Sequence, residues 1–390
     1  MRLLLVIPNL VSYRSFLREL CRALVADGAE VHLACSGEKL WEGDETGLDE
    51  GIEMHAIEFP RGMNPATHLR AARALDRLVA RLRPDIVHAH FSAAIFTTAL
   101  ALTRRWPVTF ATFHGVAFLA MQGWKATILR LAETWAARQF DVVWVLSDDD
   151  RDGLQAAAPC AVVQRLPGFG IGCDLERFTP PSATARETLR QKLGIAAGQV
   201  GFAFVGRCTD FKGFGLAVRA FLRLAATEPG VSLLLIGSRD PLHSTGLSEA
   251  EERALKNSPQ IIDAGYRADV ESLLAAADVM VFPSRREGMP VCLMEALALG
   301  VPVITLDTRG CRDVVRDGVD GLVLRAHDLE TLTAAMQRVA RDEDLRQQWS
   351  ARARADRGRF DRAHFVAIQK CLYEKALPAG RSEIPLATAP

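Results

Sequence analysis

The sequence predicts an α/β protein with two domains, each built on a parallel β-sheet that carries helices on both faces. Three observations support this fold class. The chain has 390 residues, which suits two domains better than a single core. Short apolar segments alternate with helical patterns, as in parallel sheets that are buried on both faces. A segment rich in glycine and proline, at about 166–198, separates two such series.

The expected strands follow the chain in order. The run at 3–7 is too short to span a bilayer and lacks a signal-peptide cleavage site, so we interpret it as a strand. The other strands expected in the first series cover 30–35, 85–88 and 141–146, and one more ends at Phe113. The strands expected in the second series cover 200–205, 232–236, 278–282 and 302–306. Residues after Asp328 are expected to be helical to about Leu377.

These elements predict an N-terminal Rossmann-like domain at 1–170 and a C-terminal one at 171–360, which face a central cleft. A helix at about 360–377 is free to pack back on the first domain, and residues 378–390 are expected to form a loose tail. In open parallel sheets, ligands bind beyond the carboxyl ends of the strands. The residues that directly follow each strand are therefore the candidates for function.

Composition and charge exclude several classes of partner. Lysine plus arginine and aspartate plus glutamate number 47 each, so the net charge gives no argument for nucleic acid. The eight cysteines are scattered without a C-x-x-C pair, which is typical of reduced thiols in the cytoplasm. No cluster of zinc ligands is visible, and Asp148-Asp149-Asp150 is interpreted as a helix start with a solvated face. We therefore expect a cytoplasmic protein without a metal site.

The first chemical signal follows the strand at 200–205 and reads Gly206-Arg207-Cys208-Thr209-Asp210-Phe211-Lys212-Gly213. Its glycines allow a tight turn and a close approach to a ligand. Arg207 offers a planar fork to phosphate oxygens, Lys212 adds a point charge, and a helix N-terminus follows. The order of a Walker A loop is absent. An ordinary strand–turn–helix with surface charges fits this segment alone equally well.

The second signal lies between Phe282 and Pro302. Pro290 suits a first helical turn and Gly300 the position after a helix, so a helix is expected at about 289–299. Glu287 then precedes the helix and Glu295 lies inside it, about 12 Å further along an unbroken axis. That separation is too large for a glycosidase carboxylate pair, so each is better suited to different hydroxyls of one long ligand. The apolar neighbours of Glu295 argue against a solvated side chain.

Together, the G-R-x4-K-G loop and the E-x7-E element resemble the family 4 glycosyltransferases, which have the GT-B fold. Segments 265–270, 277–279, 302–304 and 317–322 resemble the family in the same order. The resemblance implies a retaining transferase that takes its sugar from a nucleotide diphosphate, with a UDP-sugar as the expected donor. It also implies that neither a metal nor another cofactor is required.

The resemblance assigns roles residue by residue. Arg207 and Lys212 are expected to hold the donor diphosphate, Glu295 the ribose hydroxyls, and Arg267 to lie near the base. Glu287 is expected to act on the donor sugar, together with the backbone of Gly288, Met289, Pro290 and Val291. In the first half, Phe113-His114-Gly115 places His114 nearest the anomeric carbon as a second catalytic residue. His88 and His90 are interpreted as structural.

The loop after the first strand departs from the family pattern. Many members have a Gly-Gly pair there, whereas this chain reads Pro8-Asn9-Leu10-Val11-Ser12-Tyr13-Arg14. A loop with Ser12, Tyr13 and Arg14 resembles the subset that extends polyprenyl-diphosphate-linked glycans, and so does the segment 308–313. The expected acceptor is therefore a hydroxyl of a glycan or of a lipid-linked sugar, in surface polysaccharide or glycan assembly.

A basic segment suggests a membrane partner. Residues 61–138 contain eleven Lys or Arg against three acidic residues. Its arginines at 70, 73, 77 and 81 fall on one helical face, opposite Leu75, Leu78, Val79 and Leu82. The stretch 118–138, with Trp124, Lys125, Arg130, Trp135 and Arg138, fits peripheral contact with an anionic inner leaflet. A solvated helix face fits it equally well.

Two other functions remain open at this point. A nucleotide-sugar epimerase on the same fold would convert the donor without any acceptor. A degenerate transferase, retained as a binding subunit, would have lost its phosphate ligands, whereas Arg207 and Lys212 are present here. Fold alone does not separate these functions, so the assignment depends on the site.

Overall fold

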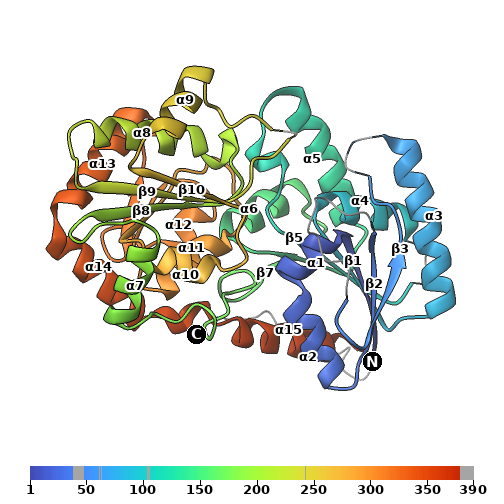
Figure 1. Ribbon diagram of the computed structural model, residues 1–390. Helices are drawn as coiled ribbons and strands as arrows, with labels where there is room; N and C mark the ends of the chain where they lie inside the picture. Colours follow the sequence, from blue (N-terminus) through green and yellow to red (C-terminus); the bar gives the residue numbers. More distant parts are fainter. Residues whose placement is uncertain (38–47, 61, 63, 103–105, 242, 378–390) are drawn as a thin grey trace. The chain divides into compact units, whose positions relative to one another are not determined.

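The computed structural model describes residues 1–37, 48–60, 62, 64–102, 106–241 and 243–377. The chain divides into two compact units (Figure 1). Unit 1 comprises Met1–Ile171 and the chain from Ala363 onward, and unit 2 comprises Gly172–Arg362. The sequence placed these boundaries after residue 170 and at 360. The expected tail at 378–390 and the arginines at 61, 104 and 105 lie outside the described residues.

Unit 1 is a parallel seven-stranded sheet in the order β3-β2-β1-β4-β5-β6-β7. Its strands are β1 (Arg2–Asn9), β2 (Glu30–Ser36), β3 (Ile52–Ala56), β4 (Ile86–His90), β5 (Val108–Phe113), β6 (Val142–Val145) and β7 (Val163–Arg165). Its helices are α1 (Leu10–Phe16), α2 (Arg18–Ala26), α3 (Pro65–Leu82), α4 (Ser92–Ala101), α5 (Gly123–Ala137), α6 (Asp148–Ala157) and α15 (Arg362–Ala376), with a 3-10 turn η1 (Phe118–Ala120). The predicted α/β class is confirmed.

Local sequence explains why α3 forms where it does. Pro65 occupies its first turn, and the Asn64 side chain caps it by accepting a hydrogen bond from the backbone N–H of Ala66. Leu75, Leu78 and Val79 are buried in the core, as the sequence pattern predicted, while the arginines at 73, 77 and 81 are exposed. The helix therefore presents a basic face outward over a firmly packed apolar face.

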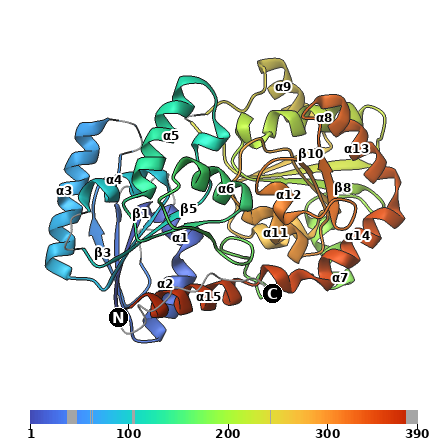
Figure 2. The ribbon, with the colours of Figure 1, turned by 180° about the vertical axis from the view of Figure 1, so that it is seen from behind.

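The C-terminal helix α15 packs on unit 1. The Tyr373 hydroxyl lies 2.5 Å from Nδ1 of His88 on β4, and Lys370 forms an ion pair with Asp27 just after α2. Both views show α15 running alongside α2 (Figures 1 and 2). Nε2 of His88 lies 2.7 Å from Oγ1 of Thr112, so both nitrogens of this buried imidazole are bound within the fold. His88 is structural, as the sequence analysis interpreted it.

Unit 2 is a parallel six-stranded sheet in the order β10-β9-β8-β11-β12-β13. Its strands are β8 (Val200–Val205), β9 (Val231–Ile236), β10 (Ile261–Gly265), β11 (Val279–Phe282), β12 (Val303–Leu306) and β13 (Gly321–Leu324). Its helices are α7 (Ala183–Lys192), α8 (Phe214–Ala225), α9 (Glu249–Asn257), α10 (Val270–Ala275), α11 (Val291–Ala298), α12 (Cys311–Val314), α13 (Leu329–Arg341) and α14 (Glu343–Ala355), with 3-10 turns η2 (Asp210–Lys212) and η3 (Arg357–Phe360).

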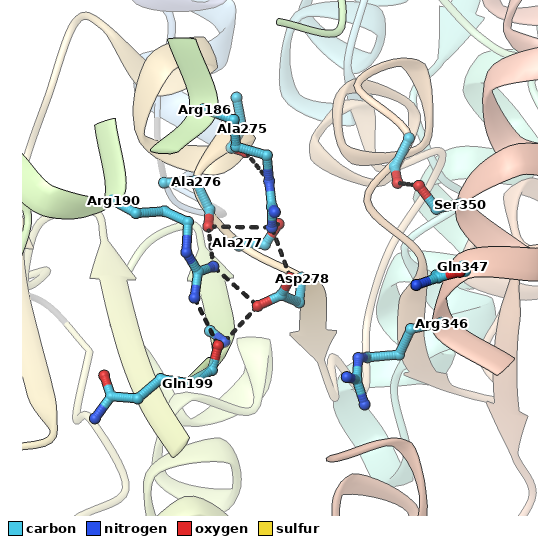
Figure 3. Close-up of polar contacts among 12 residues, drawn as sticks. Arg186, Arg190, Gln199, Ala275, Ala276, Ala277, Asp278, Arg346, Gln347 and Ser350 are labelled. Atoms are coloured by element: carbon cyan, nitrogen blue, oxygen red, sulfur yellow. Dashed lines mark hydrogen bonds and ion pairs between the residues drawn. The ribbon is translucent and has the colours of Figure 1, made fainter. Parts of the chain in front are cut away.

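Asp278 holds the base of this sheet together (Figure 3). Its carboxylate accepts hydrogen bonds from Arg186 at 2.6 Å, from Arg190 at 3.0 Å and from the backbone N–H of Gly201 at 2.7 Å. These contacts tie α7 to the amino ends of β8 and β11. Arg190 is almost fully buried, so its positive charge needs this carboxylate as a counter-charge. The Ala277-Asp278-Val279 motif therefore stabilises unit 2 at the amino ends of its strands, opposite to the carboxyl ends where ligands are expected.

The strand orders locate where ligands are expected in each unit. The order reverses direction between β1 and β4 in unit 1 and between β8 and β11 in unit 2. In doubly wound sheets, the crevice at such a switch point lies beyond the carboxyl ends of the two strands. The loops after β8 and β11, and those after β1 and β4, are therefore the places to look for a site.

Candidate functional site

In unit 2, the loops after β8 and β11 pack directly on one another. Gly213 has a φ of +78°, and a Cβ there would lie 2.0 Å from the carbonyl oxygen of Pro283. The backbone N–H of Arg285 donates to the carbonyl of Phe211 at 2.9 Å. Only glycine permits so close an approach, so the glycine that ends the G-R-x4-K-G motif is required by the contact between the two loops.

Lys212 and Glu287 connect these loops. The Lys212 ammonium donates to the two carboxylate oxygens of Glu287 at 2.7 and 2.9 Å, and the hydroxyl of Ser284 donates to the same carboxylate at 2.6 Å. The two charged side chains are 20% and 7% exposed. Their sequence motifs suggest different parts of a ligand for the two residues and do not predict this contact. An ammonium has three donors, so Lys212 can hold Glu287 and bind a ligand oxygen at once.

Arg207 lies at the rim of the same site. Its guanidinium donates to Asp240 at 2.8 Å and lies 5.5 Å from the ring centre of Phe211, and its side chain is 53% exposed. The guanidinium of Arg286 lies 6.0 Å from the centre of the same ring. Sequence reasoning did not single out Arg286, although it directly precedes the first glutamate of the E-x7-E element. Two guanidinium groups therefore flank one aromatic ring beside the Lys212–Glu287 pair.

Helix α11 begins next to this pair. It starts at Val291, so Pro290 is the N-cap residue and not part of the first turn, and the helix is shorter than the expected 289–299. No side chain caps its N-terminus. A Cβ at Gly310 would lie 2.2 Å from the carbonyl oxygen of Gly288, so the loop after β12 presses against the segment that precedes α11. Backbone N–H groups of the first turn are therefore left for an acceptor oxygen.

Glu295 is half-buried in the middle of α11. Burial raises the pKa of its carboxyl to about 7, while Arg362 and Arg177 act in the opposite direction. Across the described residues, no side chain or backbone group donates a hydrogen bond to this carboxylate. A buried carboxylate without donors is costly unless a ligand supplies them. Glu295 thus lies inside the helix, as the sequence pattern predicted, and is partly shielded from solvent.

Arg267 occupies a different position. It follows the edge strand β10 and forms a two-pronged ion pair with Asp269, with donor–acceptor distances of 2.8 and 2.7 Å. Its side chain is half-exposed and has no recorded contact with the Lys212–Glu287 pair. The sequence-based role of Arg267 near a base stays a prediction.

In unit 1, His114 directly follows β5. Its ring stacks on Phe91 at 4.3 Å between ring centres, and the edge of Phe16 meets it at 4.9 Å. Nε2 of His114 lies 3.2 Å from Nδ1 of His90. Burial lowers the pKa of His114 to about 3, so the imidazole is neutral. Phe91 has a φ of +69°, an uncommon backbone conformation for an aromatic residue, and such strain concentrates at functional sites.

Each of the two histidines has one ring nitrogen that no described residue binds. Nδ1 of His114 and Nε2 of His90 are buried and have no hydrogen-bond partner among the described residues. The direction of the contact between the two rings depends on their tautomers. In the tautomer in which His90 donates to Nε2 of His114, the neutral imidazole of His114 carries its proton on Nδ1 and can donate it to a ligand.

The segment expected to be an acceptor-binding loop is helix α1. The Asn9 side chain caps this helix by accepting from the N–H of Ser12 at 2.9 Å, which explains why a helix begins there. Tyr13 is fully buried, and its hydroxyl donates to Asp49 at 2.9 Å. The expectation that Tyr13 contacts an acceptor is therefore corrected. Ser12 and Arg14 are half-buried on the same helix, and their acceptor role stays a prediction.

A second correction concerns Asp150. Helix α6 does begin at Asp148 with Ser147 as its cap, but Asp150 is fully buried instead of solvated. Its carboxylate accepts from the N–H of Val116 at 2.9 Å and from the hydroxyl of Ser147 at 3.1 Å. It thereby fixes the chain just after His114. A buried carboxylate holding a loop explains this aspartate better than a solvated surface does.

The fold also brings together three potential metal ligands that are distant in sequence. Nδ1 of His32 on β2 lies 3.1 Å from Nε2 of His55 on β3 and 3.4 Å from a carboxylate oxygen of Glu53. All three donor atoms lie within 4.8 Å of one another. The sequence analysis saw no such cluster, because register pairing of two strands is invisible in the spacing of the chain.

A cavity of about 900 Å³ lies at the carboxyl ends of β1, β2 and β3 in unit 1. The N-terminal half of α3 and Ala93 in the first turn of α4 also line it. Its polar lining residues are Asn9, Ser36, Glu58, Asn64, Thr67 and Arg70. Four of these side chains already serve the fold. Asn9 and Asn64 cap helices, Thr67 donates to the carbonyl of Asn64, and Ser36 accepts from the N–H of Phe59. Glu58 and Arg70 are exposed and remain for a ligand.

Comparison with known proteins gives two family matches. Residues 185–356 match the family described as Glycosyl transferases group 1, and residues 13–165 match the Glycosyl transferase 4-like domain. The chain is 26% identical to the UDP-Gal:alpha-D-GlcNAc-diphosphoundecaprenol alpha-1,3-galactosyltransferase of Escherichia coli, over 76% of this chain and 77% of that protein. It is 25% identical to the N,N'-diacetylbacillosaminyl-diphospho-undecaprenol alpha-1,3-N-acetylgalactosaminyltransferase of Campylobacter jejuni, over 84% and 87% of the two chains.

Solved structures share the fold. The Anabaena protein Alr3699/HepE, solved in complex with UDP, superposes with a TM-score of 0.75 at 19% identity, over 96% of this chain and all of that one. The two sheets and their connecting helices therefore follow an architecture that is already known from solved proteins.

Proposed function

Because the chain belongs to the group 1 glycosyltransferases and has the GT-B fold, we propose that it transfers a sugar from a UDP-sugar to a hydroxyl of a lipid-diphosphate-linked glycan. The observation that carries the proposal is the Lys212–Glu287 pair, which stands at the switch point of unit 2 beside the uncapped N-terminus of α11. The E. coli and C. jejuni relatives are named for acceptors of this kind, and the first of them for a UDP-sugar donor.

Unit 2 supplies the groups that a nucleoside diphosphate requires. The phosphate oxygens would accept hydrogen bonds from Lys212, Arg207 and the first N–H groups of α11. These groups would also stabilise the negative charge that develops on the departing diphosphate. Glu287, held by Lys212 and Ser284, would accept hydrogen bonds from hydroxyls of the donor sugar. Glu295 would accept hydrogen bonds from the ribose hydroxyls. These would provide the donors that its carboxylate lacks among the described residues.

In the tautomer that carries its proton on Nδ1, His114 would provide a neutral hydrogen-bond donor from unit 1. With a pKa of about 3, His114 is not a general acid near neutral pH. Its free Nδ1 would instead donate to an oxygen of the donor sugar and orient the anomeric carbon. Retention of configuration belongs to the proposal: the departing phosphate would accept the proton of the acceptor hydroxyl on the same face. The charges of Arg207 and Lys212 would serve in place of a metal ion.

Peripheral contact with an anionic membrane also belongs to the proposal. Trp124, Ile128, Leu131 and Trp135 recur on one face of α5 and are 69%, 39%, 69% and 39% exposed. Lys125, Arg130 and Arg138 are exposed on the same helix or directly after it. Aromatic side chains flanked by basic ones are typical of helices at a lipid interface. Within the part of the chain that the structure describes, no helix is long and apolar enough to cross a membrane.

The proposal is tested by a transfer assay with a panel of UDP-, GDP- and ADP-sugars, with and without a synthetic GlcNAc-diphosphate-lipid acceptor. Release of UDP that depends on the acceptor, with a new glycosidic product, is the expected result. Conversion of the donor without acceptor would indicate an epimerase. Binding of nucleotide without turnover on any acceptor would indicate a binding subunit.

A further inference from the structure

Two cavities of unit 1 adjoin one another and differ in polarity. The first is the cavity of about 900 Å³ at the ends of β1–β3, which we call the polar cavity because polar as well as apolar side chains line it. The second, which we call the apolar groove, has about 450 Å³ and lies between α3, α4 and α5. Gly62 and Ala93 line both. On α3, Leu69 lines the groove and the next residue, Arg70, lines the polar cavity, so the boundary between them crosses one turn of helix.

The apolar groove offers almost nothing that a polar ligand could bind. Its apolar lining residues are Pro65, Leu69, Ala93, Phe96, Leu100, Ile128, Leu129 and Ala132. Three polar side chains also line it, and each has its partners in the fold. His68 is bound through one nitrogen to Thr97 at 2.8 Å and through the other to the carbonyl of Gly62 at 2.9 Å. The groove therefore suits an occupant without hydrogen-bonding groups.

The other two polar side chains are bound to each other at the wall of the groove. The Ser92 hydroxyl donates to the carboxylate of Glu133, which also accepts from the N–H groups of Ala117 and Phe118 at 3.1 and 3.0 Å. Burial raises the pKa of Glu133. With its polar atoms satisfied, this apolar hollow gains free energy when a hydrocarbon displaces its water.

The boundary between the cavities suits an anion. Arg70 is exposed, and no hydrogen bond or ion pair of its guanidinium is recorded among the described residues. Ala93 lies in the first turn of α4, whose N-cap residue Phe91 provides no capping side chain. Arg70 and Ala93 line the same cavity, so the guanidinium of Arg70 and the N–H groups of that first turn can both donate to phosphate oxygens there.

We propose that the apolar groove binds the isoprenoid chain of the acceptor, with the diphosphate at Arg70 and the first turn of α4 and the sugar in the polar cavity. This inference rests on the proposed function, because it assumes an acceptor that is linked to a lipid diphosphate. The order of the two cavities matches the order of such a molecule: sugar, diphosphate, hydrocarbon. Ile128 lines the groove and also belongs to the exposed stripe on α5, so a chain longer than the groove continues along apolar surface.

The test compares two probes with the same head, farnesyl diphosphate and dimethylallyl diphosphate, by calorimetry on the full chain with UDP at saturation. UDP fills the donor site, so the remaining difference reports the hydrocarbon chain. We expect farnesyl diphosphate to bind at least tenfold more tightly. Ala132→Trp, which fills the groove, should reduce that ratio to below about twofold, while Thr127→Trp, on the same helix but outside the groove, should leave it unchanged.

Further variants separate the head from the chain. Leu69→Gln makes the rim of the groove polar without adding volume, so it provides a second reading if Ala132→Trp does not fold, and it should also lower the ratio. Arg70→Gln should weaken both probes equally by at least fivefold, whereas Arg73→Gln should not. A ratio near one in the wild type, or one that persists in both groove variants, overturns the inference.

The outcome is separable from that of the proposed function. Transfer to an acceptor without any chain preference would retain the function and reject the groove. A preference that appears only with vesicles and is lost in Leu131→Ser, but not in Ala132→Trp, would assign it to the membrane surface and also reject the groove. Failure of transfer with every acceptor would reject the function, whatever the probes show.

Discussion

The ammonium of Lys212 binds both carboxylate oxygens of Glu287 and thereby joins the loops after β8 and β11. The two residues are 75 positions apart in the sequence, yet each belongs to one of the two motifs that mark the candidate donor site. The pair is mostly buried, and Ser284 gives the carboxylate a third hydrogen bond. The charge that would bind a phosphate and the carboxylate that would bind a sugar are thus positioned by each other.

This coupling predicts how variants combine. Lys212→Ala and Glu287→Ala should each lower turnover at least tenfold, and the double variant should be much less impaired than the product of the two, because either single change already breaks the pair. Arg285→Ala, in the same loop but paired with Asp210, should remain within about twofold of the wild type. Steady-state kinetics on folded variants checks this. Multiplicative effects would mean that the two residues act independently.

Glu295 predicts a pH dependence of stability. Its pKa of about 7 in the folded state lies above that of an exposed glutamate, about 4.3. The folded state therefore holds a proton that the unfolded chain releases, so this contribution is complete below about pH 4.3 and is lost as the pH rises through about 7. Without nucleotide, Glu295→Gln should lose less stability than the wild type between pH 5 and pH 8. Parallel curves of melting temperature against pH would contradict this.

His114 is predicted to act without titrating. Because its pKa of about 3 leaves it neutral, His114→Ala should lower kcat/KM at least tenfold and leave the shape of the pH profile unchanged between pH 5 and pH 9. His114→Asn, whose amide N–H stands near the position of Nδ1, should retain more activity than His114→Ala. If the acidic limb of the profile disappears in His114→Ala, the imidazole titrates in the working range and the assigned role is wrong.

Asp278 predicts a stability effect at the edge of the sheet opposite to the site (Figure 3). Asp278→Ala leaves Arg190 buried without a counter-charge and should lower the free energy of unfolding by about 3 kcal/mol. Asp278→Asn keeps an acceptor for Gly201 and should cost less. Asp344→Ala, exposed in the first turn of α14, is the control. Urea unfolding followed by tryptophan fluorescence measures these changes, and an effect below about 1 kcal/mol for Asp278→Ala would show that Arg190 finds other partners.

The exposed stripe on α5 predicts lipid-dependent flotation. Wild-type protein should float with vesicles that contain anionic lipid and remain in the soluble fraction with neutral ones. Replacing Trp124 and Leu131 together by serine should abolish flotation, because these are the most exposed apolar residues of the stripe. No difference between anionic and neutral vesicles would count against membrane contact.

The sequence predicted what depends on local pattern. Continuous apolar strands such as β1 and β8, which alternate with helical patterns, lead directly to two parallel sheets. Short edge strands were harder: β3 has polar residues at alternate positions and β13 has four residues, so neither stands out from a loop. Lys212, Glu287 and Glu295 are candidates from the sequence because they belong to the two motifs that resemble the family 4 glycosyltransferases.

What the sequence could not provide is the pairing of distant groups. The contact between Lys212 and Glu287, and the hydrogen bond from Tyr13 to Asp49, depend on how separate loops and helices meet in three dimensions. The same holds for the apolar groove, whose lining comes from three helices. The charged neighbours Asp148 and Asp149 favour a solvated side chain for Asp150. Only the fold shows that its carboxylate is buried and accepts a hydrogen bond from the N–H of Val116.

The most direct test of the donor site is calorimetric titration of UDP into wild-type protein and into Lys212→Ala, both in EDTA. We predict that the wild type binds UDP in the presence of the chelator and that Lys212→Ala binds it at least tenfold more weakly, with its fold intact by circular dichroism. Absence of UDP binding by the wild type in EDTA, or equal affinity in the variant, would contradict a metal-independent diphosphate site built on Lys212 and Glu287.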